Sequence, residues 1–209
     1  MPFASVAELA DWIQENRLLT PQQNEELASL DTSKFADPPA LLRELLNRGW
    51  LTRYQLQKIQ NDQGSRLLVG PYRILDRLGA GGMGDVYRAR HLFMDRVVAL
   101  KLINREWLKS PKSVGRFMQE TRAAAQLVHP NIVLAYDANE INGIYFFAME
   151  FIEGIDLAKL VARSGPLPYA EACEYIRQAA LGLQHAFEDR KSTRLNSSHI
   201  AVSRMPSSA

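Results

Sequence analysis

The stretch "LGAGGMGDVY", Leu78–Tyr87, is the most informative short segment of this sequence. Gly79, Gly81 and Gly84 have the spacing G-x-G-x-x-G, which dinucleotide-binding folds place between a strand and a helix. Here the flanking segments "YRILDRLG" and "DVYRAR" both alternate in polarity, which predicts two strands. Backbone amides of a glycine-rich hairpin can approach phosphates because no Cβ intervenes. Taken alone, the motif is equally compatible with an ordinary flexible hairpin.

A lysine in the next predicted strand supports the phosphate interpretation. In "RVVALKLI", Arg96–Ile103, alternation places Ala99 and Lys101 on one face. A flat ring could pack on the small Ala99 while the Lys101 ammonium reaches anionic oxygens beyond it. The alternative is a lysine whose stem packs in the strand while its ammonium extends into water.

A carboxylate in the following segment suggests a partner for that lysine. Residues 111–128 predict a helix, and Glu120 falls on its apolar stripe between Phe117 and Ala124. A buried carboxylate without a partner costs several kcal/mol. We therefore expect Lys101 to pair with Glu120.

The remaining segments alternate strands and helices. "NIVLAYDA" and "IYFFAMEF" predict strands joined by a tight turn at Asn142-Gly143, where both residue types tolerate positive φ. Ala170–Glu188 predicts a long amphipathic helix. Its Cys173, the single cysteine, excludes an intrachain disulfide and is predicted to be a small core residue, which suits a reducing compartment.

The first 64 residues contain an internal repeat. "LADWIQENRLLTPQQNEEL" from Leu9 and "LLRELLNRGWLTRYQLQKI" from Leu41 match at an offset of 32 residues. Each unit predicts a helical hairpin, and the two hairpins are expected to form a bundle separate from the strands. The predicted capping boxes are Ser5 with Glu8, Thr20 with Gln23, and Thr52 with Gln55, and Asp37 is expected to cap the third helix.

In order and spacing, these motifs resemble the protein kinase family, of the bacterial eukaryotic-like Ser/Thr type. The resemblance covers residues 71–188. It implies an α+β fold, with a five-stranded antiparallel sheet plus one helix, then the first helices of the large lobe. A small all-α helical-hairpin bundle precedes this fold.

The resemblance also implies ATP as cofactor and a set of site residues. Lys101 would hold the α- and β-phosphates and pair with Glu120. Met149 would be the gatekeeper, and the backbones of Glu150 and Ile152 would bind adenine. Asp156 could reach the ribose or cap a helix, and His129 is expected to be structural. The implied nucleotide-contacting set is Leu78, Gly79, Ala80, Gly81, Gly82, Met83, Gly84, Asp85, Val86, Ala99, Lys101, Met149, Glu150, Ile152 and Asp156.

The catalytic loop H-R-D-x-x-x-x-N and the D-F-G motif do not occur in this sequence. The resemblance therefore implies a parent kinase that uses Mg²⁺ and ATP on protein substrates, and a fragment that is inactive and lacks the metal ligands. The alternative is a non-catalytic nucleotide-binding scaffold whose bundle recruits a protein partner. We expect no nucleic-acid partner and a cytoplasmic location, although the parent could span a membrane beyond this segment.

The expected organisation is a helical repeat bundle at 1–64, a linker at 65–70, a partial kinase domain at 71–188 and a non-native tail at 189–209. The tail, "DRKSTRLNSSHIAVSRMPSSA", can be back-translated into two constant parts of a sequencing-library adapter, and the alternative is a genuine polar, Ser-rich disordered segment. The tail contributes four basic side chains and one acidic side chain to the net charge of +2. The positive net charge therefore gives no evidence for nucleic-acid binding.

Overall fold

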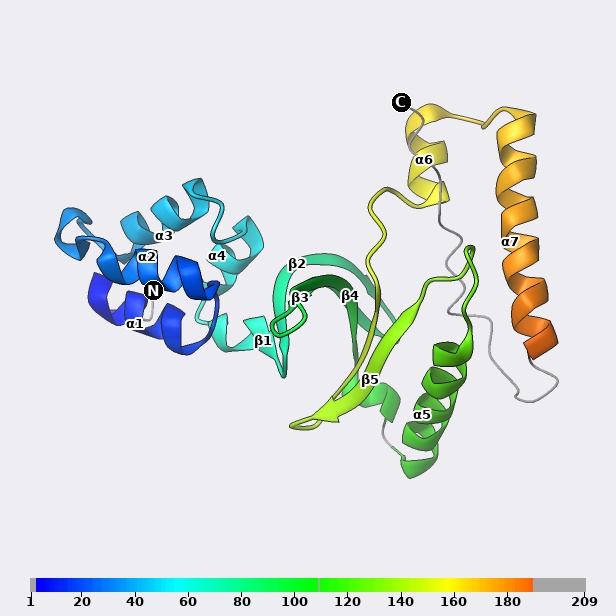
Figure 1. The fold of residues 1–209 in the computed structure, drawn as a ribbon, viewed down its shortest axis with the longest axis horizontal. Helices are drawn as coiled ribbons and strands as arrows, with labels where there is room; N and C mark the ends of the chain where they lie inside the picture. Colours follow the sequence, from blue (N-terminus) through cyan, green and yellow to red (C-terminus); the bar gives the residue numbers. More distant parts are fainter. Residues whose placement is uncertain (1–2, 109, 190–209) are drawn as a thin grey trace. The chain divides into compact units, whose positions relative to one another are not determined.

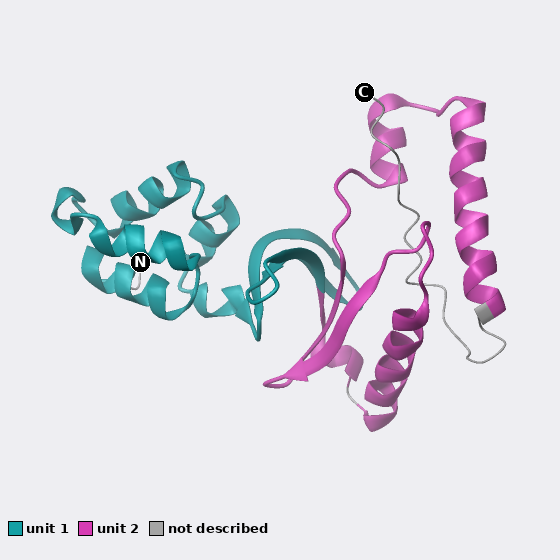
Figure 2. Cartoon of the chain, in the orientation of Figure 1, with its two compact units in different colours: residues 1–100 teal, residues 101–209 magenta. Residues whose placement is uncertain are grey.

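A computed structural model of the chain describes residues 3–108 and 110–189. The chain divides into two compact units, residues 1–100 and 101–209, which Figure 2 shows in teal and magenta. The division falls inside strand β4, whereas the sequence predicts a boundary at residues 65–70. The predicted tail at 189–209 lies outside the described residues, apart from the last position of a helix. None of the helices in the described ranges is long and apolar enough to cross a bilayer.

The first unit begins with two helical hairpins (Figure 1). The helices are α1 (Val6–Glu15), α2 (Pro21–Ser29), α3 (Pro38–Asn47) and α4 (Arg53–Gln60), with short 3₁₀ turns η1 (Thr32–Lys34) and η2 (Gly64–Leu67). Helix α3 begins and ends 32 positions after α1, and α4 begins 32 positions after α2. The helices therefore repeat with the same 32-residue offset as the sequence.

Equivalent apolar core positions of the two hairpins have equivalent environments. Buried residues recur at the offset of 32, in the pairs Leu9 and Leu41, Ile13 and Leu45, and Leu27 and Ile59. The first inter-helix turn contains Arg17 at φ 51°, and the second contains Gly49 at φ 70°. The turn geometry therefore needs a left-handed residue, which glycine adopts without steric cost.

Local capping explains where these helices start. Thr20–Gln23 and Thr52–Gln55 form complete capping boxes, and the Asp37 carboxylate accepts from the Ala40 amide at 2.8 Å. The predicted box at Ser5 is only half formed. Ser5 accepts from the Glu8 amide, but the Glu8 carboxylate accepts from the Ala4 amide instead of that of Ser5.

The sheet contains β1 (Leu68–Val69), β2 (Tyr72–Gly81), β3 (Gly84–His91), β4 (Arg96–Ile103), β5 (Ala135–Ile141) and β6 (Ile144–Glu150), in the order β1-β2-β3-β4-β6-β5. The prediction of five strands is therefore wrong by one. The additional strand, β1, arises in the predicted linker, where Leu67 and Val69 are buried apolar side chains.

The second unit continues with η3 (Arg105–Leu108), α5 (Pro111–Gln126), α6 (Leu157–Ser164) and α7 (Tyr169–Asp189). Asn142 and Gly143 have φ values of 52° and 76°, which confirms the tight turn between β5 and β6. Strand β5 begins four residues later than the predicted segment at Asn131, because Asn131 and Ile132 instead form a buried turn after α5.

Helix α7 packs on that turn. Leu127, Ile132 and Ala186 form a buried cluster, and the Asn131 amide group donates to the Gln178 side chain at 3.1 Å. Other apolar residues of α7 are exposed, with Ile176 and Phe187 each 68% accessible. Cys173 is also exposed, so its predicted core position is wrong. It lies on a side of α7 that is not packed against the turn.

Candidate nucleotide-binding site

The glycine motif forms an open hairpin in the first unit. Strands β2 and β3 pair from Tyr72↔His91 to Gly81↔Gly84, so Gly82 and Met83 make the turn. A Cβ added to Gly79 or Gly82 would meet nothing within 4 Å. The tip therefore presents backbone without side chains above it, as a loop that approaches phosphates requires.

Charged and phenolic side chains fasten the base of this hairpin. Arg77 donates to the Asp85 carboxylate at 2.8 Å, and the Tyr87 hydroxyl donates to the same carboxylate at 3.3 Å. Arg88 also forms an ion pair with Asp76. Asp85, predicted to lie near the nucleotide, is thus bound to two side chains of the hairpin itself.

The side chains expected to hold adenine differ in exposure within the first unit. Leu78 on β2 is 42% accessible, Val86 on β3 is half-buried and Ala99 on β4 is buried at 8%. Ala80 is exposed and Met83 is half-buried at the hairpin. Leu78, Val86 and Ala99 thus range from exposed to buried, as expected for apolar side chains that a flat ring could cover.

Lys101 and Glu120 both lie in the second unit and are both half-buried. Burial lowers the pKa of the Lys101 ammonium. Phe117, one turn before Glu120 on α5, packs edge-on against Tyr145 of β6 with ring centroids 6.2 Å apart. Glu120 therefore lies on the covered side of α5, as its pattern predicts, whereas its pairing with Lys101 stays a prediction.

The segment expected to be the hinge follows β6. Met149 is half-buried and pairs with Ala135 in the sheet. The Glu150 amide donates to the Leu134 carbonyl at 2.8 Å, so any hydrogen bond of the Glu150 backbone to adenine would use its carbonyl oxygen. Ile152 is half-buried just beyond the strand.

Asp156 is the N-cap of α6. Its carboxylate accepts from the Lys159 amide at 2.8 Å and lies 3.0 Å from the Lys159 ammonium. These hydrogen bonds, the backbone one first, lower the pKa of Asp156. The capping alternative is therefore confirmed. His129 also has a structural contact, because its Nδ1 accepts from the Asn131 amide and its ring stacks on His185 at 5.0 Å.

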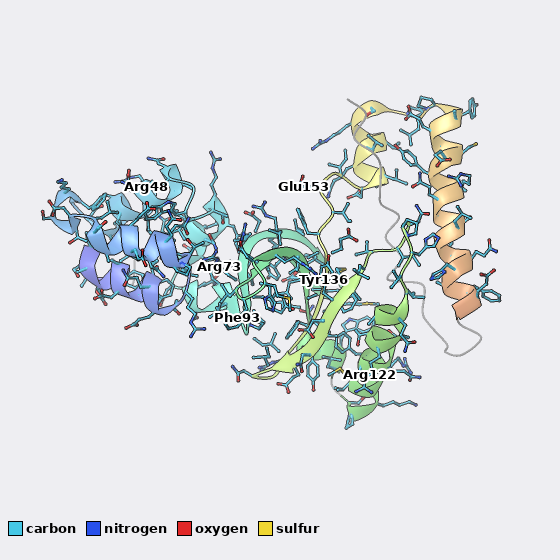
Figure 3. The ribbon with its side chains drawn as sticks, in the orientation of Figure 1. Arg48, Arg73, Phe93, Arg122, Tyr136 and Glu153 are labelled. Carbon is cyan, nitrogen blue, oxygen red and sulfur yellow. The ribbon has the colours of Figure 1, made fainter. Side chains whose placement is uncertain are left out.

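A hollow lies along α5, and its lining does not include Glu120. Its volume is about 330 Å³, and its lining includes Met118, Gln119 and Arg122, the last labelled in Figure 3. It is not part of the predicted nucleotide site. In the described ranges, no group of three or more His, Cys, Asp or Glu side chains comes together. These residues do not by themselves fit a magnesium ion, and we derive no step through one.

Sequence reasoning missed the contacts behind the glycine hairpin. Gln55 of α4 is buried and donates to the Ile74 carbonyl of β2, and Tyr54 lies 6.2 Å from the Tyr87 ring. The only sequence signal was indirect. At the position that Tyr54 occupies in the second repeat, the first repeat has Gln22. Such a difference between the repeats can mark a contact that only one of them makes.

A glycine-rich β-hairpin, a half-buried lysine in the next strand and a helix that turns a glutamate inward are the parts of a protein kinase small lobe. The chain belongs to the protein kinase domain family, whose profile matches residues 72–191. Its sequence is similar to kinases of two bacterial groups and its fold to a solved kinase domain.

The serine/threonine-protein kinase PrkC of Bacillus subtilis is 36% identical over 123 residues, which are 59% of this chain and 19% of PrkC. The serine/threonine-protein kinase PknE of Mycobacterium tuberculosis is 40% identical over 119 residues, 56% of this chain and 21% of PknE. The crystal structure of the M. tuberculosis PknI kinase domain superposes with a TM-score of 0.52 at 30% identity, covering 58% of this chain and 50% of that domain. The chain thus spans about a fifth of the curated relatives' length.

Proposed function

We propose that the chain is the ATP-binding part of a Ser/Thr protein kinase whose complete form transfers the γ-phosphoryl group of Mg-ATP to protein hydroxyls. The observation that supports this most is the placement of two charged residues in the family-matched segment. Lys101 is half-buried in a strand, and Glu120 lies on the covered side of α5. Partial burial of a charge is costly unless the charge is paired or binds a ligand, and a phosphate site would supply that compensation.

Each residue type has a role that its environment suits. The amides of Gly79–Gly84 would donate to phosphate oxygens, and the Lys101 ammonium would neutralise their charge while Glu120 orients it. Leu78, Val86 and Ala99 would contact adenine. Met149 would limit the depth of the pocket, and the Glu150 carbonyl and Ile152 amide would bind the base. Because Asp156 caps α6, a ribose contact from it would have to compete with Lys159.

Transfer needs more than these residues supply. The γ-phosphorus bond to the ADP oxygen breaks, a bond to the substrate hydroxyl oxygen forms, and that hydroxyl loses a proton to a base. The family's base lies in the H-R-D loop, which this sequence does not contain. We therefore propose that this chain binds nucleotide without transferring phosphate, and that the complete kinase is cytoplasmic and acts on protein substrates.

Substitution of Lys101 in the complete protein tests this proposal. We expect Lys101→Met to lower phosphate transfer to a protein substrate by at least about 100-fold, because one preorganised charge contact is lost. Lys112→Met, at an exposed lysine of α5, is the matched control and should retain the activity. Full activity of Lys101→Met, with the control also active, would refute the assigned role.

A further inference from the structure

The helical repeat is attached to strand β2 at three consecutive residues, Arg73, Ile74 and Leu75. The Arg73 guanidinium donates to the Arg17 carbonyl at 3.4 Å. The Gln55 side chain donates to the Ile74 carbonyl at 2.8 Å, and the Thr52 hydroxyl donates to the Leu75 carbonyl. All of these groups belong to the first unit.

These contacts meet β2 where its ladder is irregular. The register with β3 shifts between Ile74 and Asp76, so Leu75 is the extra residue of a bulge. Carbonyls at a bulge lose regular partners, and a buried carbonyl needs a donor. Gln55 of α4 donates to the Ile74 carbonyl, and Thr52, the N-cap of α4, donates to the Leu75 carbonyl. The bulge lies on β2 a few residues before Gly79, the first glycine of the motif.

The attachment site is desolvated, which distinguishes it from a loose surface contact. Gln55 is 1% accessible and Arg73, labelled in Figure 3, is 6% accessible. Burial lowers the pKa of the Arg73 guanidinium. The buried contact between the Gln55 amide and the Ile74 carbonyl favours one arrangement of α4 on β2, because its loss would leave both groups unpaired.

A second line of contact runs from α4 to the hairpin base. The Tyr54 ring lies 6.2 Å from the Tyr87 ring, and Tyr87 donates to the Asp85 carboxylate that also binds Arg77. Asp85 directly follows Gly84, the last glycine of the motif. Movement of α4 would therefore change both the bulge and the side chains that fasten the hairpin.

Both repeats have the same threonine–glutamine capping box, but only the second uses its glutamine to contact β2. In each, a glutamine accepts from the threonine amide at 2.9 Å, Gln23 from Thr20 and Gln55 from Thr52. Gln55 additionally reaches β2. Gln23 is partly exposed, and its side chain makes no hydrogen bond to a strand in the described part of the chain. The docking is thus a property of the second repeat and not a requirement of the helical hairpin.

We propose that the helical repeat positions the glycine-rich hairpin from within the same chain. Thr52, Tyr54 and Gln55 act as positioning residues that fix the β2 bulge and the hairpin base. The repeat is thereby part of the nucleotide site's construction, beyond any recruitment of a partner. Only the second of the two measurements below rests on the proposed ATP site.

The test compares Gln55→Glu with Gln23→Glu in the 209-residue chain. Glutamate closes a capping box as glutamine does, so both variants keep their helix starts. Only Gln55→Glu replaces the amide donor to Ile74 with an acceptor. Amide hydrogen exchange over residues 76–87 should be faster by roughly five- to tenfold in Gln55→Glu and unchanged in Gln23→Glu. Equal exchange in both variants would overturn the proposal.

Affinity for a fluorescent ATP analogue gives an independent measurement. We expect Gln55→Glu to bind roughly three- to tenfold more weakly, with Gln23→Glu like the unsubstituted chain. If neither variant nor the unsubstituted chain binds the analogue, the ATP proposal fails, and hydrogen exchange still decides the positioning role. If Gln55→Glu is unfolded by circular dichroism, Tyr54→Leu against the equivalent Gln22→Leu provides the same comparison.

Discussion

Thr52 combines two functions in one hydroxyl, and its removal should cost more than removal of the equivalent Thr20. Each hydroxyl accepts from the amide three residues later, Gln23 at 3.2 Å and Gln55 at 3.1 Å. Loss of such a cap costs about 1 kcal/mol of stability. The Thr52 hydroxyl additionally donates to the Leu75 carbonyl.

The expected difference follows from that additional bond. Thr20→Ala should lower the free energy of unfolding by about 1 kcal/mol. Thr52→Ala also leaves the Leu75 carbonyl, at a partly buried position, without this donor, which costs a further ~1–3 kcal/mol. We therefore expect a total loss of about 2–4 kcal/mol for Thr52→Ala, and near-complete retention of stability for Thr52→Ser, which keeps the hydroxyl.

Urea unfolding followed by tryptophan fluorescence measures these differences. Trp12 and Trp50 lie in the helical repeat and Trp107 in the second unit, so a Trp107→Phe background reports the first unit alone. The midpoint should fall further for Thr52→Ala than for Thr20→Ala at equal slope. Equal losses for the two threonines would refute the reasoning that the second repeat is bonded to β2.

Three further predictions concern single sites. Gly64→Ala should lower the free energy of unfolding by about 1–3 kcal/mol in urea melts, because its Cβ would lie 2.3 Å from the Trp12 ring, whereas no loss would show that the ring moves freely. The pH–rate profile for acetylation of Lys101, read by mass spectrometry, should have a midpoint below the ordinary lysine pKa of about 10.4, because burial lowers the pKa of its ammonium. Burial also raises the pKa of Tyr87, so above about pH 10 the unfolded chain loses a proton that the folded chain keeps. The free energy of unfolding should then fall as the pH rises above about 10, and less steeply in Tyr87→Phe, while parallel slopes would contradict the shift.

The features that sequence reasoning predicted are those fixed by local chemistry. The glycine hairpin, the strand of Lys101 and the Asn142-Gly143 turn depend on residues within a few positions of one another. The capping boxes at Thr20 and Thr52 likewise involve residues three apart. Alternation and helical periodicity then identify the residues that share a face, which grouped Glu120 with the apolar residues of α5.

The features it missed depend on contacts between distant segments. Gln55 bonds to a carbonyl 19 residues away, and no local pattern distinguishes it from Gln23, which has the same capping role. The two-residue strand β1 is too short to show alternation of polar and apolar residues. Cys173 is a residue type that is usually buried, but it lies on a side of α7 that the described part of the chain leaves exposed. Sequence periodicity says which residues share a face and does not say whether a partner covers that face.

The central claim is that this chain binds ATP through Lys101 and the glycine-rich hairpin. Isothermal titration of ATP into the 209-residue chain tests it most directly, with Lys101→Met and the exposed control Lys112→Met measured alongside. We predict saturable one-to-one binding for the unsubstituted chain and the control, and at least about tenfold weaker binding for Lys101→Met with an unchanged circular dichroism spectrum, because a charge-assisted contact to phosphate is lost. Absence of ATP binding, or equal affinity of the Lys101→Met variant, would contradict the account.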